Sequence, residues 1–97
     1  MVTINWADEA SFWLKDIHDY IAQDNPKIAK KVVNEILTKT KILSSFPKIG
    51  YPYEDDTNND VRILLYGHYR IAYLIKDTET IDILVVFHGA LAIERYL

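Results

Sequence analysis

Two charged or titratable side chains, Arg70 and His88, stand out as groups that could do chemistry, because Arg70 comes directly before one apolar segment and His88 directly after another. A cation on an apolar strand must find an anion or stay at the edge of a groove. Arg70 is therefore expected to bind a phosphate or a partner's carboxylate, or to pair within the chain with an acid such as Asp82. His88 could act as a general acid or base, although a hydrogen-bonded histidine at a strand end is the simpler expectation.

Several other chemistries are not expected. The chain has no cysteine, which excludes disulfides, thiolate metal sites and cysteine nucleophiles. His68, His88 and Asp82 lack the spacing of zinc ligands, and there is no G-x-S-x-G motif and no phosphate-binding glycine loop. The sequence therefore predicts neither a metal nor a cofactor, and His18 receives no role.

Hydrophobic periodicity predicts the elements that position these groups. The first helix is expected to have one apolar stripe, formed by Ala10, Trp13, Leu14, Ile17, Tyr20 and Ile21. Asn25 and Pro26 cap and begin the second of two helices, and the Phe46-Pro47 pair ends it. The expected elements are a short strand at 2–6, helices at about 8–23 and from 26 onward, a loop at 47–60, and strands at 61–66, 69–76 and 81–88. The prediction is a single α+β domain over residues 1–97, in which an antiparallel helical hairpin packs on an antiparallel three- to four-stranded sheet.

Strand alternation assigns the side chains to two faces of that sheet. The expected register places Ile71 opposite Phe87 and Tyr73 opposite Val85, and the helices are expected to cover their face. On the second face Arg70 is then expected roughly opposite His88, with Leu64 on its other side. The second face collects polar groups among many apolar ones, too many for a face in water, so we predict a binding surface there. The alternative is that residues 90–97 fold back over it. The second-face residues expected to bind are Arg62, Leu64, Tyr66, Arg70, Leu74, Leu84, Val86 and His88.

Charge and hydropathy restrict the class of protein. The net charge of −3 argues against a surface that grips nucleic acid by bulk electrostatics. No segment is long and apolar enough to span a bilayer, and the N-terminal residues do not form a signal peptide. A cytoplasmic protein is therefore expected.

The order of the elements, together with four segments, resembles the RelE/ParE superfamily of toxins from bacterial type II toxin–antitoxin pairs. The segments are INWADEASFWLKDIHDYIAQDNPKIA, LSSFPKIGYP, VRILLYGHYRIAYLI and ILVVFHGA. The opening and the final HGA are more like the ParE branch. The resemblance implies a cytoplasmic toxin neutralised by a cognate antitoxin. ParE-like members act on DNA gyrase, whereas RelE-like members cut messenger RNA on the ribosome, so a gyrase-inhibiting binding protein is the first expectation.

The RelE-like alternative implies specific cations around the scissile phosphate. Arg70 matches the arginine of the YR pair, but the expected lysine positions fall near Asn58, Asn59 and Asp60. RelE-like members also have an arginine after the final strand, and many ParE-like members have one there too, but this sequence has Leu91 near that position.

A second nuclease arrangement in the superfamily uses a glutamate, a strand arginine and a terminal histidine, which Glu54, Arg70 and His88 could supply. A third alternative is an inactive toxin-fold protein that only binds an antitoxin, because Leu91 replaces the arginine and Arg95 is the nearest cation. Arg95 is included in the expected target- or antitoxin-binding surface.

The resemblance also suggests how partners would bind. We expect the antitoxin to lay an extended or helical segment along apolar grooves, and a homodimer or higher-order toxin–antitoxin assembly is compatible with the chain. The lysines of the second helix are expected to be a solvated face, with an acidic antitoxin or gyrase-held DNA as alternatives: Lys27, Lys30, Lys31 and Lys41.

Overall fold

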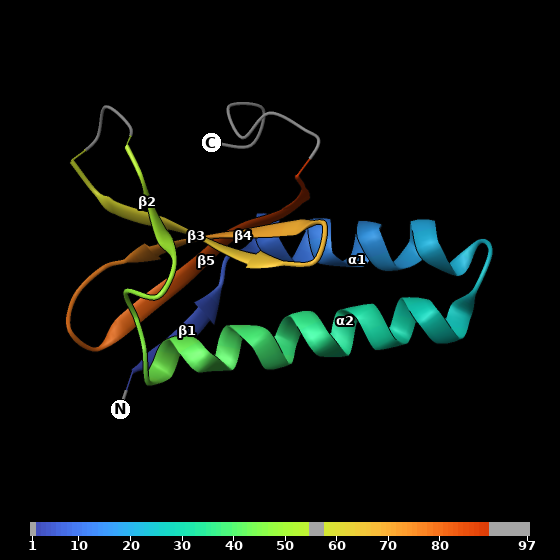
Figure 1. Ribbon diagram of the computed structural model, residues 1–97, viewed down its shortest axis with the longest axis horizontal. Coiled ribbons are helices and arrows are strands. Elements are labelled where there is room, and N and C mark those ends of the chain that lie inside the picture. The colour runs from blue at the N-terminus through green and yellow to red at the C-terminus, as the bar shows by residue number, and fades with distance from the viewer. Residues whose placement is uncertain (1, 55–57, 90–97) are drawn as a thin grey trace.

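The computed structural model describes residues 2–54 and 58–89. Figure 1 shows the long helices lying side by side against a twisted sheet. The predicted α+β architecture and helical hairpin are confirmed. The connected ends of the two helices extend beyond the sheet in this view. In chain order the elements are β1 (Thr3–Trp6), α1 (Asp8–Ala22), α2 (Pro26–Lys41), the 3-10 turn η1 (Ile42–Ser44), β2 (Tyr51–Tyr53), β3 (Asp60–Tyr66), β4 (Tyr69–Ile75) and β5 (Thr80–His88).

The helix boundaries follow from local sequence. The side chain of Asn25 accepts a hydrogen bond from the Ile28 N–H at 3.2 Å, and Pro26 occupies the first turn. Asp8 and Glu9 place negative charge at the positive end of the α1 dipole. No helix among the described residues has the length and apolar character needed to cross a bilayer.

Within residues 2–54 and 58–89 the sheet has five strands in the order β1-β5-β4-β3-β2, one or two more than predicted. β1 pairs with β5 in parallel, and the other neighbours are antiparallel, so the sheet is mixed. The additional edge strand, β2, lies in the segment 47–60 that was expected to be a loop. It is only three residues long and contains Pro52, so it carries almost no local strand signal.

A bulge in β5 makes the predicted register wrong. Ile71 pairs with Val86 rather than Phe87, and Tyr73 pairs with Ile83 rather than Val85, with Leu84 as the extra residue between them. A bulge moves every later side chain of its strand to the opposite face. The β3–β4 register is also offset from the prediction, because Leu64 lies opposite Ile71.

The apolar side chains consequently form two buried clusters, one on each side of the sheet. The cluster under the helices joins Ala10 and Leu14 of α1 to strand residues such as Ile71. On the far face the buried residues are Ile63, Ala72, Val85 and Phe87, with Trp13, Tyr53 and Leu84 packed against them. Val85 and Phe87, which were expected on the face covered by the helices, therefore lie on the far face, and the far face is buried at all four of these positions. The alternative cover, residues 90–97, lies outside the described residues.

Candidate binding site at the ends of β4 and β5

A groove opens between α1 and the end of β5, and we call it the α1–β5 groove. β1 accompanies β5 only as far as Ile83, which pairs with Trp6. α1 begins two residues after Trp6 and packs against β5. The groove has a volume of about 420 Å³ and is rich in aromatic side chains; it is lined by Trp13, Asp16, Ile17, Tyr20, Tyr69, Val86, Phe87 and His88.

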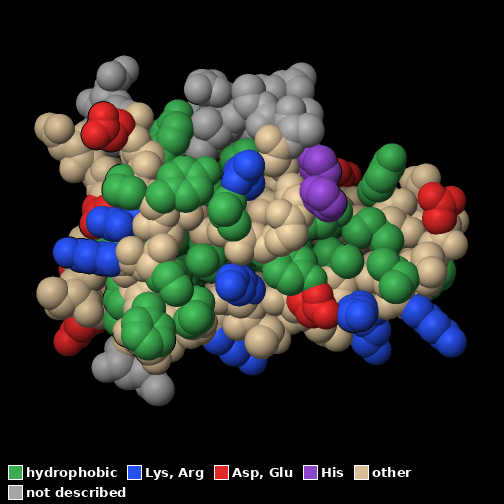
Figure 2. Space-filling model, in the orientation of Figure 1, with side chains coloured by type: hydrophobic (Ala, Val, Ile, Leu, Met, Phe, Trp, Pro, Cys, Tyr) green, Lys and Arg blue, Asp and Glu red, His purple; other side chains and the backbone are tan. Residues whose placement is uncertain are grey.

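Tyr69 and His88 meet where β4 begins and β5 ends. They are register partners, and their rings contact edge to face with centroids 5.7 Å apart. The His68 ring stacks on His88 at 5.9 Å, and Figure 2 shows histidine side chains gathered in one place on this face. Burial, and secondarily the nearby Tyr20, raise the pKa of Tyr69. The Tyr69 hydroxyl is therefore a neutral hydrogen-bond donor at neutral pH.

Arg70 lies beside this groove, but its side chain is on the face of the sheet opposite the helices. Its register partners are Leu65 and Phe87. A Cβ at Gly89 would come within 2.9 Å of the Arg70 Nε, so the glycine lets the guanidinium lie against the end of β5. The Gly89 N–H donates to the His68 carbonyl at 2.7 Å, which ties the two strand ends together.

The charge of Arg70 is not neutralised by any carboxylate within residues 2–54 and 58–89. The alternative pairing with Asp82 is wrong, because the Asp82 carboxylate lies 3.7 Å from the Lys76 Nζ. An unpaired guanidinium beside an aromatic groove can hold a carboxylate or a phosphate through two parallel hydrogen bonds.

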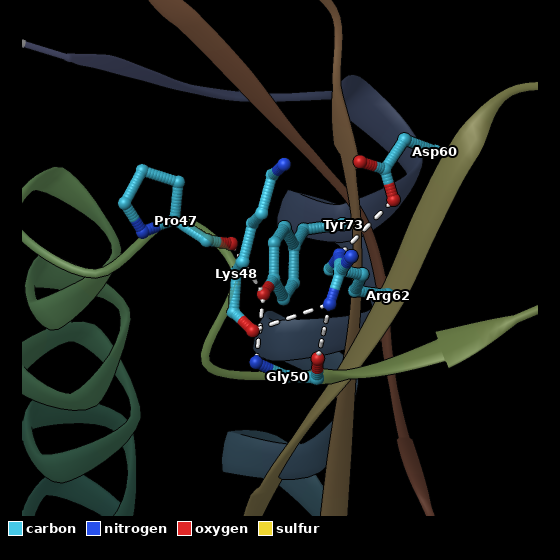
Figure 3. Close-up of polar contacts among 6 residues, drawn as sticks. All are labelled: Pro47, Lys48, Gly50, Asp60, Arg62 and Tyr73. Atoms are coloured by element: carbon cyan, nitrogen blue, oxygen red, sulfur yellow. Dashed lines mark hydrogen bonds and ion pairs between the residues drawn. The ribbon is translucent and has the colours of Figure 1, made fainter.

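Arg62 has a different environment, which Figure 3 shows as part of a polar cluster that we call the Tyr73 clasp. The cluster holds the segment after η1 onto β3 and β4. The Tyr73 hydroxyl donates to the Pro47 carbonyl at 2.7 Å and accepts from the Gly50 N–H at 2.9 Å. The members of the clasp are Pro47, Lys48, Gly50, Asp60, Arg62 and Tyr73.

Within the clasp the Arg62 guanidinium is used internally. Its Nε donates to Asp60 Oδ1 at 3.0 Å, and its Nη1 donates to the carbonyls of Lys48 at 3.2 Å and Gly50 at 3.0 Å. These contacts position the 48–50 backbone against β3. Arg62 therefore has a structural role, whereas the sequence predicted it only as part of the binding surface.

The structure does not place the predicted binding residues on one face. Leu64 and Val86 are buried beneath the helices, with 5% and 0% of their surfaces exposed. Leu84 lies at the bulge and packs on the far-face cluster. The face assignment was wrong because the bulge and the β3 offset invert the alternation.

The remaining predicted residues are similarly divided. Tyr66 contacts the helix-side cluster, whereas Arg70 and Leu74 lie on the far side of the sheet. His88 is at the mouth of the α1–β5 groove. Arg95 and Leu91 lie outside the described residues.

The Glu54, Arg70 and His88 arrangement is not assembled. Glu54 lies in a polar pocket with Asn58, Asn59 and Asp60. That pocket is at the β2–β3 end, where Tyr53 pairs with Val61 and Val61 with Leu74. Leu74 is four residues along β4 from Arg70, which corresponds to about 13 Å. Glu54 therefore cannot share a reacting atom with Arg70 and His88.

The part of the site that sequence reasoning missed is its aromatic wall. Trp13 and Tyr20 were assigned to the buried stripe of the first helix, yet Tyr20 is 75% exposed. Their spacing of seven residues suits a stripe in the core as well as the wall of a groove. The spacing alone therefore does not distinguish a buried side chain from one that lines the groove. Within the described ranges, no three histidine or acidic side chains converge in a way that could hold a metal ion.

Comparisons with known proteins agree with this geometry. The family described as "ParE toxin of type II toxin-antitoxin system, parDE" matches residues 4–92. A solved structure of the chromosomal ParDE toxin–antitoxin system from P. aeruginosa is similar, with a TM-score of 0.74 and 24% identity over 91% of this chain and 96% of that chain. The RelBE2 toxin–antitoxin complex from Mycobacterium tuberculosis is also similar, with a TM-score of 0.63 and 26% identity over 90% and 96% of the two chains. No curated protein matches the chain.

Proposed function

Because this chain belongs to the ParE toxin family of type II toxin–antitoxin systems, we propose that it inhibits DNA gyrase by binding it and that a cognate antitoxin neutralises it. The observation that carries the proposal is the family match over residues 4–92, which spans α1, α2 and, apart from Thr3, every strand of the described residues. Gyrase acts in the cytoplasm, so the proposal includes a cytoplasmic location. The chain acts as a binding protein and needs no catalytic group.

The site offers a partner two kinds of contact at adjacent places. The α1–β5 groove accepts an apolar or aromatic side chain between Trp13 and Tyr20. Arg70, on the other side of the same strand ends, provides a cation for a carboxylate. Aromatic residues with an arginine nearby are typical of the residues that dominate binding energy at protein interfaces. The groove and Arg70 are therefore our candidates for target or antitoxin recognition.

Gyrase supercoiling assays test the proposal directly. Purified chain is titrated into a reaction containing gyrase, ATP and relaxed plasmid, and loss of supercoiling is expected at micromolar concentration or below. Arg70→Ala should weaken inhibition roughly tenfold, as expected for loss of a charged interface contact, while the exposed α1 control Lys15→Ala should not. Full supercoiling at the highest soluble concentration would refute gyrase inhibition.

The antitoxin part of the proposal has its own test. A protein that binds only the folded toxin raises its melting temperature by mass action. The product of a neighbouring small reading frame, added at saturation, should therefore raise the melting temperature of the chain. Identical melting curves with and without that protein would count against it as the antitoxin.

One observation favours a second candidate, a RelE-like ribosome-dependent endoribonuclease. Arg70, a possible phosphate ligand, and His88, a possible proton carrier, lie at the adjoining ends of β4 and β5, although their neighbouring register positions place the two side chains on opposite faces of the sheet. Against it, Asp60 occupies an expected cation position and is paired with Arg62.

Messenger RNA from cells in which this chain is induced separates the candidates. Cleaved messenger supports the nuclease, and intact messenger with growth arrest supports gyrase inhibition. Unchanged growth would support the inactive, antitoxin-binding alternative.

A further inference from the structure

The α1–β5 groove has a charge that its aromatic side chains alone do not explain. Trp13, Asp16 and Tyr20 line it from α1, and Tyr69 and His88 line it from the strand ends. One carboxylate therefore lies among several aromatic rings. Among the described residues, no lysine or arginine lines the groove. The lining thus combines π-faces with a single negative charge.

Helical spacing places this carboxylate between two of the rings. Asp16 comes three residues after Trp13 and four residues before Tyr20, and side chains at these separations are neighbours on a helix surface, about 5–6 Å apart. The three side chains therefore form one stripe of α1. Tyr20 is 75% exposed and lies near the end of α1 that extends past the sheet in Figure 1. Most of its ring is therefore accessible to a partner.

The charge of Asp16 is not neutralised within residues 2–54 and 58–89, where no lysine, arginine or histidine forms an ion pair with it. α1 contains four acids and one lysine, whereas α2 contains five lysines and one acid. Arg70 lies on the face of the sheet opposite the helices, so it does not place a cation in the groove. The local field along α1 therefore favours a positively charged ligand.

A purely apolar side chain of a partner would suit this groove less well than a cation with an apolar stem. It would cover Asp16 and remove water from the carboxylate without replacing the lost hydrogen bonds, which is costly. An arginine side chain avoids that cost. Its methylene stem can pack on apolar lining such as Ile17 and Val86, while its charged head stays with the polar group.

The guanidinium group of arginine matches the groove better than the ammonium group of lysine. It is planar and stacks on aromatic faces, and its N–H fork can donate two parallel hydrogen bonds to one carboxylate. A cation over the face of an aromatic ring is also attracted by the ring quadrupole. Tyr20 and Tyr69 supply rings of this kind, and Asp16 supplies the carboxylate.

We propose that the α1–β5 groove recognises an arginine side chain of a partner protein, whose guanidinium pairs with Asp16 and stacks against Tyr20. The inference rests on the proposed function in one respect, because it names the chemical group that the candidate recognition site takes. Its test contains only the chain and small probes. Failure of that test and failure of gyrase inhibition are therefore separate results.

The test is an NMR titration of the isotope-labelled chain. The chain has two tryptophans, of which Trp13 lines the α1–β5 groove and Trp6 lies outside it. Their indole N–H signals therefore provide a reporter and an internal reference. The first probe is N-acetyl-arginine methylamide. The second is its citrulline counterpart, which is neutral and nearly the same shape, and the third is its lysine counterpart.

Two pairs of variants separate the contributions of charge and ring. Asp16→Asn removes the proposed partner of the guanidinium, and Asp19→Asn removes the same charge from an exposed carboxylate of α1 that does not line the groove. Tyr20→Leu removes the aromatic ring, whereas Tyr20→Phe keeps it. All three positions are exposed, so the variants should fold as the parent does.

The arginine probe should shift the Trp13 signal saturably and bind at least about tenfold more tightly than the citrulline probe. Asp16→Asn should weaken binding about threefold to fivefold, as for a partly exposed ion pair, and Asp19→Asn should stay within about twofold. Tyr20→Leu should weaken binding about threefold, and Tyr20→Phe should bind as the parent does.

Four results would overturn the proposal. They are the absence of a saturable shift at Trp13, equal binding of the arginine and citrulline probes, tighter binding of the lysine probe, and equal effects of Asp16→Asn and Asp19→Asn.

Discussion

Arg62 and Arg70 lie on consecutive strands of one hairpin, eight residues apart, yet they have opposite environments. Arg62 bonds to Asp60 and to two backbone carbonyls in the Tyr73 clasp. Arg70 lies against Gly89 with no carboxylate of the described residues paired to it. Arginine thus stabilises the fold at one end of the sheet, as Arg62, and remains available for a partner at the other end, as Arg70. The difference predicts that changes in the clasp lower stability, whereas changes at Arg70 lower binding.

The largest effect is expected from Gly50→Ala. A Cβ there would lie 2.7 Å from the Ile63 carbonyl oxygen and 2.8 Å from the Tyr73 ring. Neither neighbour can move freely, so the substitution should cost about 3 kcal/mol of stability. Gly89→Ala is the matched control, since its close neighbour is the flexible Arg70 side chain. Urea unfolding of both variants measures the difference, and equal losses would contradict the comparison.

Tyr73→Phe should have the next largest effect. The change leaves the Gly50 N–H and the Pro47 carbonyl without their hydroxyl partner. An unsatisfied buried polar group costs about 1–3 kcal/mol, so a loss near 2 kcal/mol is expected in chemical unfolding. A variant as stable as the parent would show that water replaces the hydroxyl and that the clasp is dispensable.

The two arginines provide the sharpest comparison at a smaller magnitude. Arg62→Met should destabilise the chain by about 1 kcal/mol, because it unpairs Asp60 and two carbonyls. Arg70→Met should change stability by less than about 0.5 kcal/mol, as is usual for surface residues, because no carboxylate of the described residues pairs with Arg70. Thermal melts measure the stability of both variants. In supercoiling assays, Arg70→Met should lose more inhibition than Arg62→Met. A large stability loss in Arg70→Met would mean that its guanidinium has a structural role.

The smallest effect concerns alkaline pH. Burial, and secondarily the Asp60 charge, raise the pKa of Tyr73 above 10.0, against the opposing effects of the Gly50 hydrogen bond and Arg62. A pKa that is higher in the folded state contributes stability below pH 10, and this stability is lost as the pH rises through the folded value. Unfolding free energy should therefore decline above pH 10, and less steeply in Tyr73→Phe. Parallel declines in the two proteins would assign the loss to other groups, such as Tyr69.

Local signals in the sequence were enough to predict the two helices and every strand of the described residues except β2. Asn25 and Pro26 mark the start of α2, and the hydrophobic stripe beginning at Ala10 marks the inner face of α1. The predictions were wrong for the registers of β3, β4 and β5, which depend on pairing between segments that are distant in the sequence. Tyr20 was expected to be buried, because nothing near it in sequence shows that its helix extends past the sheet.

The elements, their order and the family resemblance were determined by the sequence itself, because helix capping and hydrophobic periodicity act between residues that are close along the chain. The tertiary structure decided which side chains became the candidate site. From Ile83 to Phe87 every residue of β5 is apolar, so alternation cannot locate the bulge at Leu84 or reveal which face each side chain joins. Only the pairing of β5 with β4 sets that register, and with it the burial of Val86 and the access of partners to Arg70.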